Sequence, residues 1–138
     1  MSWVTDRQTT IYSRVSAILT AQLSEQYADL NVTMDNAMLQ NAKFPTIYIT
    51  FLGARERGQT LDGTNINAVR MDVEAHVLTS KSQTRPMIEN NFIAWDVVDA
   101  FKTMGFEVTM PSIPTSNVDG VYESVSRFSR IIGQDDII

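Results

Sequence analysis

A glycine-punctuated run that follows an apolar segment is the first place where this chain could do chemistry. Gly53, Gly58 and Thr60 stand at the spacing of a phosphate-binding loop, in which backbone amides and a lysine hold the phosphates. Gln59 occupies the lysine position, and the residues that follow predict a strand, so no helix N-terminus would face an anion. We therefore interpret the match as chance and expect no nucleotide site.

The single histidine is the second candidate. His76 follows Asp72 and Glu74 at steps of two, so the three side chains would share one side of a strand. Imidazole and carboxylate groups at that spacing could bind a metal ion. A lone histidine among strand carboxylates is more often solvated or at an interface, and we expect no metal. No serine lies in a G-x-S-x-G context, so no triad with His76 is predicted.

Paired carboxylates and thiols complete the search for catalytic groups. Asp96 and Asp99 could pair on a helix, but a solvated helix edge explains them. The chain has no cysteine, which excludes thiol catalysis, disulfides and cysteine-based zinc sites. No convergent set of residues emerges, and we expect a protein that is not an enzyme.

Composition narrows the class further. The 138 residues fit a single domain, 1–138, and the net charge of −5 argues against a nucleic-acid binder, which would carry a basic face. No apolar run approaches the about 20 residues of a membrane span. The first residues lack the basic and apolar segments of a signal peptide, so we expect no export by that route.

Two strands and the segment between them position the candidate residues. Residues 46–52 predict one strand, and residues 66–78 predict a second, half buried in an antiparallel sheet because its apolar and polar residues alternate. The segment 53–65 is far longer than a hairpin needs, so we expect a binding loop or a disordered one. The alternation places Val69, Met71, Val73, Ala75 and Val77 on one face and Arg70, Asp72, Glu74 and His76 on the other.

Two helices are predicted. The first starts at a capping box formed by Thr5 and Gln8 and runs amphipathically to about residue 27. The second has Ser82 or Thr84 as its cap and Pro86 in its first turn. It ends at Gly105, with Phe106 packing back as in a Schellman motif. Its predicted apolar face comprises Ile88, Phe92, Trp95, Val98, Phe101 and Met104. Of these, Phe92, Trp95, Val98 and Phe101 should pack with Val69, Met71, Val73 and Val77.

Shorter segments complete the order. Residues 31–34 predict a short strand and 35–43 stay unassigned. Residues 106–110 predict a strand broken by the prolines of 111–114, and 121–132 predict a last strand before a short tail, 133–138. The order α-β-β-β-α-β-β predicts an α+β fold: an antiparallel or mixed sheet with two helices packed on one face.

The segment order carries a resemblance. Its features are a helix opening near Thr5, a proline at Phe44-Pro45 introducing the first long strand, the strand 69–77 and a Ser/Lys-rich turn at 79–83. They continue with a helix ending at residues 100–106, then Met110-Pro111, and a last strand with Tyr122, Arg127 and Phe128. Over nearly the whole chain this pattern resembles the tail-terminator, or tail-completion, proteins of tailed bacteriophages.

The resemblance implies a structural role. Such proteins form rings, usually hexamers, that cap the finished tail tube, stop its growth and present a surface to the head-tail connector. It implies no enzymatic activity, no cofactor and no membrane partner, and DNA only passes through the lumen. The implied location is the virion tail or neck, after assembly in the host cytoplasm.

Two alternatives stay open beside this reading. One is a phage head-completion or neck protein, and the other is a small non-enzymatic α+β module that binds a ligand or partner. For the ring we expect the polar strand face and the segment 53–65 to lie at the interface with a neighbouring subunit or the tail tube. The predicted interface residues are Arg55, Glu56, Arg57, Thr60, Asp62, Arg70, Asp72, Glu74 and His76.

Overall fold

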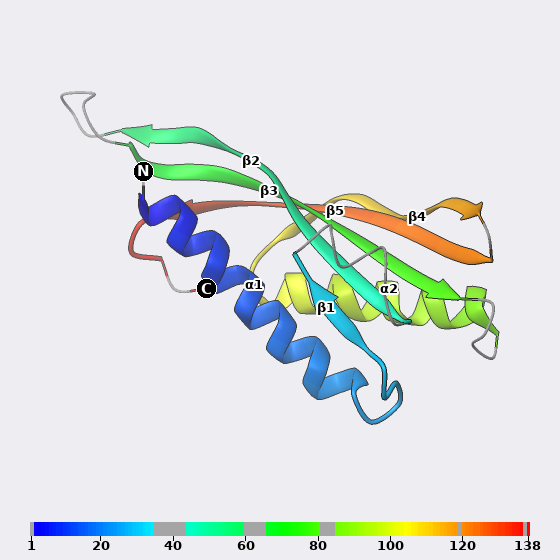
Figure 1. The fold of residues 1–138 in the computed structure, drawn as a ribbon. Coiled ribbons are helices and arrows are strands. Elements are labelled where there is room, and N and C mark those ends of the chain that lie inside the picture. Colours follow the sequence, from blue (N-terminus) through cyan, green and yellow to red (C-terminus); the bar gives the residue numbers. More distant parts are fainter. Residues whose placement is uncertain (1, 35–43, 60–65, 81–84, 119, 137) are drawn as a thin grey trace.

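The protein has the α+β fold expected from its sequence. The computed structural model describes residues 2–34, 44–59, 66–80, 85–118, 120–136 and 138. Both helices of this part of the chain lie on the same face of its mixed sheet (Figure 1), and the predicted element order is confirmed. The elements are α1 (Ser2–Leu23), β1 (Asn31–Thr33), β2 (Thr46–Gln59), β3 (Ile66–Ser80), α2 (Pro86–Thr103), β4 (Glu107–Val118) and β5 (Val121–Gly133).

The sheet has the strand order β1-β2-β3-β5-β4. Strand β1 pairs parallel with β2, and the other neighbours are antiparallel. Strands β2 and β3 lie side by side near the middle of the sheet (Figure 1). Strand β3 therefore has a neighbour on each side along its length, β2 and β5.

The long loop predicted for 53–65 is wrong over its first half. Strand β2 continues to Gln59, and this extension pairs with β3 through Ala54 opposite Met71 and Gln59 opposite Ile66. The register shifts between Phe51 and Gly53 and again twice after Glu56. Such bulges interrupt the alternation of side chains, so the sequence pattern there does not look like a strand. Residues 60–65 lie outside the described residues.

Helix α1 begins earlier than predicted. It starts at Ser2, so Thr5 lies inside the helix and the predicted capping box is wrong. The hydroxyl of Thr9 donates to the carbonyl of Thr5 at 3.1 Å, the backward bond that threonine makes within a helix. The helix ends at Leu23 rather than near residue 27. Its buried side chains are Val4, Ile11, Val15, Leu19 and Leu23.

Both ends of α2 are determined by residues at or next to them in the sequence. Pro86 lies in the first turn as predicted, after Arg85 with φ of 52°, while the predicted caps Ser82 and Thr84 lie outside the described residues. The Schellman motif is confirmed at the other end. Gly105, at φ of 81°, donates to Lys102 at 3.0 Å, and Phe106 donates to the carbonyl of Phe101 at 3.1 Å.

The predicted apolar face of α2 is half wrong. Val98, Phe101 and Met104 are buried as expected. Ile88, Phe92 and Trp95 are instead 46, 62 and 54% exposed. The helix carries apolar side chains on two sides, and the side against the sheet is the one with the smaller residues. The residues of α2 that are buried there are Asn90, Ile93, Ala94, Val97, Val98, Ala100 and Phe101.

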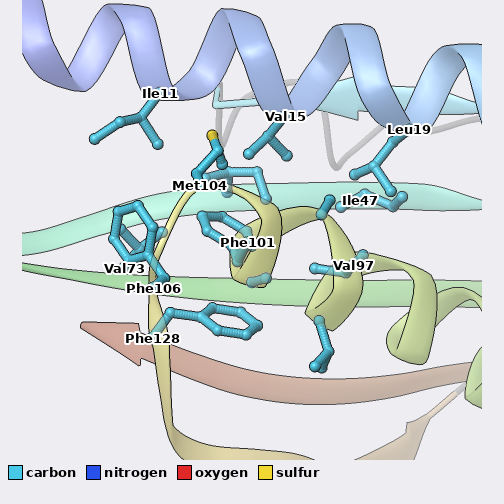
Figure 2. Packing of buried hydrophobic residues seen from close by; sticks show 14 of the residues in the cluster. Ile11, Val15, Leu19, Ile47, Val73, Val97, Phe101, Met104, Phe106 and Phe128 are labelled. Atoms are coloured by element: carbon cyan, nitrogen blue, oxygen red, sulfur yellow. The ribbon is translucent and has the colours of Figure 1, made fainter. Parts of the chain in front are cut away.

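An aromatic group forms the middle of the core. Phe101 stacks on Phe128 of β5, with ring centroids 4.3 Å apart, and meets the ring of Phe106 edge-on at 5.3 Å. Figure 2 shows Ile11 and Val15 pointing from α1 toward this group. The expectation that Phe101 packs with the inward face of residues 66–78 is confirmed, because Val69, Met71, Val73 and Val77 are buried in the same cluster.

Strand β4 runs through the segment where a break was predicted. It continues past Pro111 and Pro114 to Val118, with register shifts against β5 on either side of Ile113. The strand tolerates proline because it lies at the edge of the sheet, where one side has no ladder to complete. The turn that follows contains Gly120, at φ of 76°.

The segment after β5 packs on α1. Arg7 donates from Nε and Nη2 to the carbonyl of Gln134, at 3.1 and 2.6 Å. Arg14 donates to the main-chain oxygen of Ile138, whose side chain is buried in the core cluster. The predicted tail 133–138 is therefore held against the first helix at its described residues.

Candidate functional site

The sheet face turned away from the helices carries four of the predicted interface residues, those of β3. Neither described helix covers this face, which we call the open face (Figure 1). The predicted alternation is confirmed: the odd-numbered residues from Val69 to Thr79 are buried, and Arg70, Asp72, Glu74 and His76 are partly exposed on the other side. Strand β5 contributes Arg127 opposite Glu74 and Ser129 opposite Asp72.

These side chains bind one another. Glu74 lies at the centre, with Oε2 at 2.8 Å from Arg127 Nε and Oε1 at 2.6 Å from His76 Nε2. The other ring nitrogen of His76 lies 3.6 Å from Glu123 Oε2, and the ring packs at 5.6 Å from that of Tyr48. A connected row of charges therefore crosses from β3 to β5.

A second pair continues the row. Arg70 donates from Nε to the hydroxyl of Ser129 at 2.8 Å, and the same nitrogen lies 3.4 Å from Asp72 Oδ1. Sequence analysis missed the β5 members of both groups. The signal that could have found them is the antiparallel register, which places alternate residues of the last strand beside those of β3.

The environment of Glu74 keeps it ionised. Burial alone would raise the pKa of this carboxyl group, but hydrogen bonds from Arg127 and His76, together with their charges, outweigh burial and lower the pKa below its usual value. The carboxylates lie beneath their partners: Glu74 is 13% exposed against 50% for Arg127, and Asp72 is 23% exposed against 34% for Arg70. The open face therefore presents guanidinium groups above recessed carboxylates.

Two shallow hollows adjoin these arginines. The first, of about 290 Å³, and the second, of about 430 Å³, both include Arg70 in their linings. Planar guanidinium groups at the rim suit carboxylate ligands, which they can bind through two parallel hydrogen bonds. The first hollow is lined by Leu52, Gly53, Arg70, Asp72, Thr109, Arg127 and Phe128, and the second by Arg70, Gly105, Glu107, Ser129, Arg130 and Ile131.

The remaining predicted interface residues belong to β2 or lie outside the described residues. Arg55 and Glu56 belong to β2, where the backbone pairs with Arg70 and Val69. Arg57 lies at a register shift of the same strand. Thr60 and Asp62 lie outside the described residues. The glycine run considered as a phosphate loop is thus strand at least to Gln59.

A second exposed surface lies on α2, and its three apolar residues are ones that sequence analysis assigned to the core. Ile88, Phe92, Trp95 and Asp99 follow one another at steps of four, three and four residues, on the side of the helix opposite Ile93, Val97 and Phe101. We call these four residues the outward stripe. Their exposure distinguishes them from ordinary core positions, since large exposed apolar patches mark contacts with other molecules.

A third hollow borders the outward stripe. It measures about 230 Å³ and lies between the end of α1 and the start of α2, with Phe92, Arg85, Glu89 and Asp96 in its lining. The hydroxyl of Tyr27 donates to Glu89 Oε2 across it. Burial, and then the negative charge of Asp99, raise the pKa of Asp96 above its usual value.

Metal binding and membrane insertion are two further possibilities for the described part of the chain. Among those residues no three His, Asp or Glu side chains come together as metal ligands. Of the two described helices, neither has the length and apolar character that crossing a bilayer requires. No protein-family model matches the sequence, and no curated protein matches it.

Proposed function

We propose that this protein is a structural virion assembly protein that forms a ring on the end of a phage tail tube, ends tail polymerisation and provides the surface for head joining. The observation that carries the proposal is the presence of two unlike surfaces on opposite sides of one domain. The open face carries paired charges, whereas the outward stripe of α2 is largely apolar. A head-to-tail ring requires such a pair of different surfaces on every subunit.

The charge row of the open face suits this role. Glu74, Arg127, His76 and Arg70 are held by hydrogen bonds to one another or to Ser129. Charges fixed in this way specify register and partner more than affinity. The described elements follow the order on which the resemblance to tail-terminator proteins is based.

The proposal is tested by tube polymerisation. The tail tube protein of the same phage is polymerised alone and with increasing amounts of this protein, and tube lengths and ends are measured by negative-stain electron microscopy. We expect shorter tubes and a ring of density at one end. Tubes of unchanged length with bare ends would refute the proposal.

A second experiment distinguishes tail capping from the alternative function of a head-completion or neck protein. DNA-filled heads that lack tails are incubated with the protein and sedimented. Binding to heads with no effect on tube length would identify a head-completion or neck protein instead.

A further inference from the structure

The only histidine of the chain lies between carboxylates from two neighbouring strands of the open face. Its Nε2 atom is 2.6 Å from Oε1 of Glu74 on the same strand, and its Nδ1 atom is 3.6 Å from Oε2 of Glu123 on β5. In the register of the sheet His76 is opposite Val125, so Glu123 is a diagonal neighbour, which long side chains can reach. Both ring nitrogens therefore face carboxylate oxygens.

The number of protons on the ring decides whether both contacts are favourable. A carboxylate oxygen only accepts hydrogen bonds, and a neutral imidazole has one N–H group and one nitrogen lone pair. In the neutral ring, one lone pair therefore faces a carboxylate oxygen with no hydrogen between them. Only the imidazolium ion, which has an N–H group on each nitrogen and a positive charge, is complementary to Glu74 and Glu123 at the same time.

Titratable and charged groups face His76 from both strands beside it and from its own strand. Tyr48 of β2 lies directly opposite, with its ring centroid 5.6 Å from that of His76. Strand β5 contributes Glu123 and Arg127, and β3 itself contributes Glu74. Arg127 contacts Oε2 of Glu74 whereas His76 contacts Oε1, so the two basic groups use different oxygens. Both described helices lie on the other face of the sheet (Figure 1).

The partial burial of this group makes the charge of the ring important. The side chains of His76, Glu74 and Glu123 are 20, 13 and 27% exposed, so solvent screens their charges less than those of fully exposed pairs. When the ring is charged, it and Arg127 balance the two carboxylates. When the ring is neutral, two negative charges remain against one positive charge, and the contact with Glu123 loses its attraction.

We propose that His76 is a proton-dependent bridge between β3 and β5 that controls the charge of the open face. The imidazolium ion joins Glu74 to Glu123, and loss of its proton removes the attraction to Glu123 and leaves the open face more negative. Imidazole is the side chain whose ordinary change of charge falls between about pH 5 and 8. The bridge is therefore present at the acidic end of this range and is lost as the pH rises. It forms within one subunit, so it is independent of the proposed function.

A double-mutant cycle at two pH values tests the bridge. The variants are His76→Gln, Glu123→Gln and the combination of both, and urea denaturation gives the folding equilibrium constant of each at about pH 5.5 and about pH 8.5. The lower pH lies above the range in which Glu74 loses its charge, because the pKa of Glu74 is lowered from 4.5. Both substitutions introduce an uncharged polar side chain of similar size at a partly exposed position, so each variant should fold, which circular dichroism verifies.

We expect the two substitutions to be coupled only at the lower pH. There the equilibrium constant of the double variant should differ by about threefold from the value that independent effects would give, whereas at the higher pH the difference should disappear. Since the attraction is between charges, about 1 M NaCl should weaken the coupling at the lower pH. Coupling of the same size at both pH values would overturn the proposal, and so would its absence at the lower pH.

A carboxylate elsewhere on the sheet provides the matched control. Glu107 is exposed at the start of β4 and is opposite Ser129, whereas His76 is opposite Val125. Glu107→Gln combined with His76→Gln should therefore show no coupling at either pH. Equal coupling of His76→Gln with Glu107→Gln and with Glu123→Gln would mean that the effect comes from the total charge of the subunit, and it would overturn the bridge.

Discussion

Glu74 is the residue on which the charge row of the open face depends, because it binds both Arg127 and His76. Its pKa is lower in the folded protein than the ordinary value of 4.5. The folded state therefore holds this proton less tightly than the unfolded state. The ionised Glu74 therefore stabilises the folded state. This stabilisation is fully present above about pH 4.5 and is lost as the pH falls through the lowered pKa of the folded protein.

A neutral replacement tests this dependence. Glu74→Gln should lower the free energy of unfolding at pH 7, and the deficit should shrink below about pH 4.5 as the wild-type carboxylate is protonated. Urea denaturation at a series of pH values measures the difference. Glu25→Gln, at an exposed position of the chain, is the control. A deficit that stays constant between pH 7 and pH 3 would contradict the assigned role.

Two phenylalanines of α2 give a matched comparison of core and surface. Phe101 is fully buried against Phe128, whereas Phe92 is 62% exposed. Phe101→Ala should cost ~3–5 kcal/mol of unfolding free energy, since it leaves a cavity in the core. Phe92→Ala should change it by only about 0.5 kcal/mol in dilute protein. Equal losses from the two substitutions would contradict the burial of Phe101 and the exposure of Phe92.

At the scale of elements, a buried amide fixes α2 on the sheet. Asn90 donates from Nδ2 to the carbonyls of Val77 and Tyr122, at 2.9 and 3.0 Å, and Oδ1 accepts from the hydroxyl of Ser124 at 2.6 Å. These contacts join α2 to both β3 and β5. A buried polar group with satisfied partners specifies one position of a helix on a sheet more sharply than apolar contacts do.

Removing this amide should loosen the helix. Asn90→Ala leaves two carbonyls and a hydroxyl without their partner, so we expect a loss of about 1–3 kcal/mol in the free energy of unfolding. Asn91→Ala changes the exposed neighbour in the same way and should be almost neutral. Hydrogen exchange adds a local measurement: amides of α2 should lose protection in the first variant only. Equal exchange in both variants would refute this anchoring role.

The sequence predicted elements well where periodicity and end signals agreed. The alternation in β3 and the Schellman end at Gly105 gave correct assignments. Prediction from sequence failed where one sequence pattern is compatible with two different structures. Bulges hid the strand after Gly53, and prolines suggested a break in β4 because an edge position was not visible from the sequence.

The candidate surfaces were only partly predicted from the sequence. The polar side of β3 was correct, because strand alternation assigns a face without knowledge of neighbours. Its partners Arg127 and Ser129 required the β3–β5 register, which only the folded sheet supplies. The outward stripe was missed because Trp95 and Phe92 were grouped with Val98 and Phe101 into one broad apolar face, while α2 is apolar on two sides.

At the scale of the whole molecule, self-association should be visible in thermal stability. A native multimer is favoured over unfolded chains by mass action, so its Tm rises with protein concentration. We expect differential scanning calorimetry of the wild type to show this rise over a hundredfold dilution series, and Trp95→Glu to show a constant Tm. A wild-type Tm that does not depend on concentration would contradict assembly of the folded subunit.

The two prolines of β4 restrict how copies of this protein can meet. Each lacks an amide hydrogen, and the register shifts beside Ile113 bend the free margin of the sheet. The opposite margin is β1, which spans only Asn31–Thr33. Neither margin is a good template for backbone pairing with another chain, so the sheet is poorly suited to growing sideways into a fibre. Any assembly must then form through side-chain contacts, and substitution of surface residues can change the size at which its growth stops.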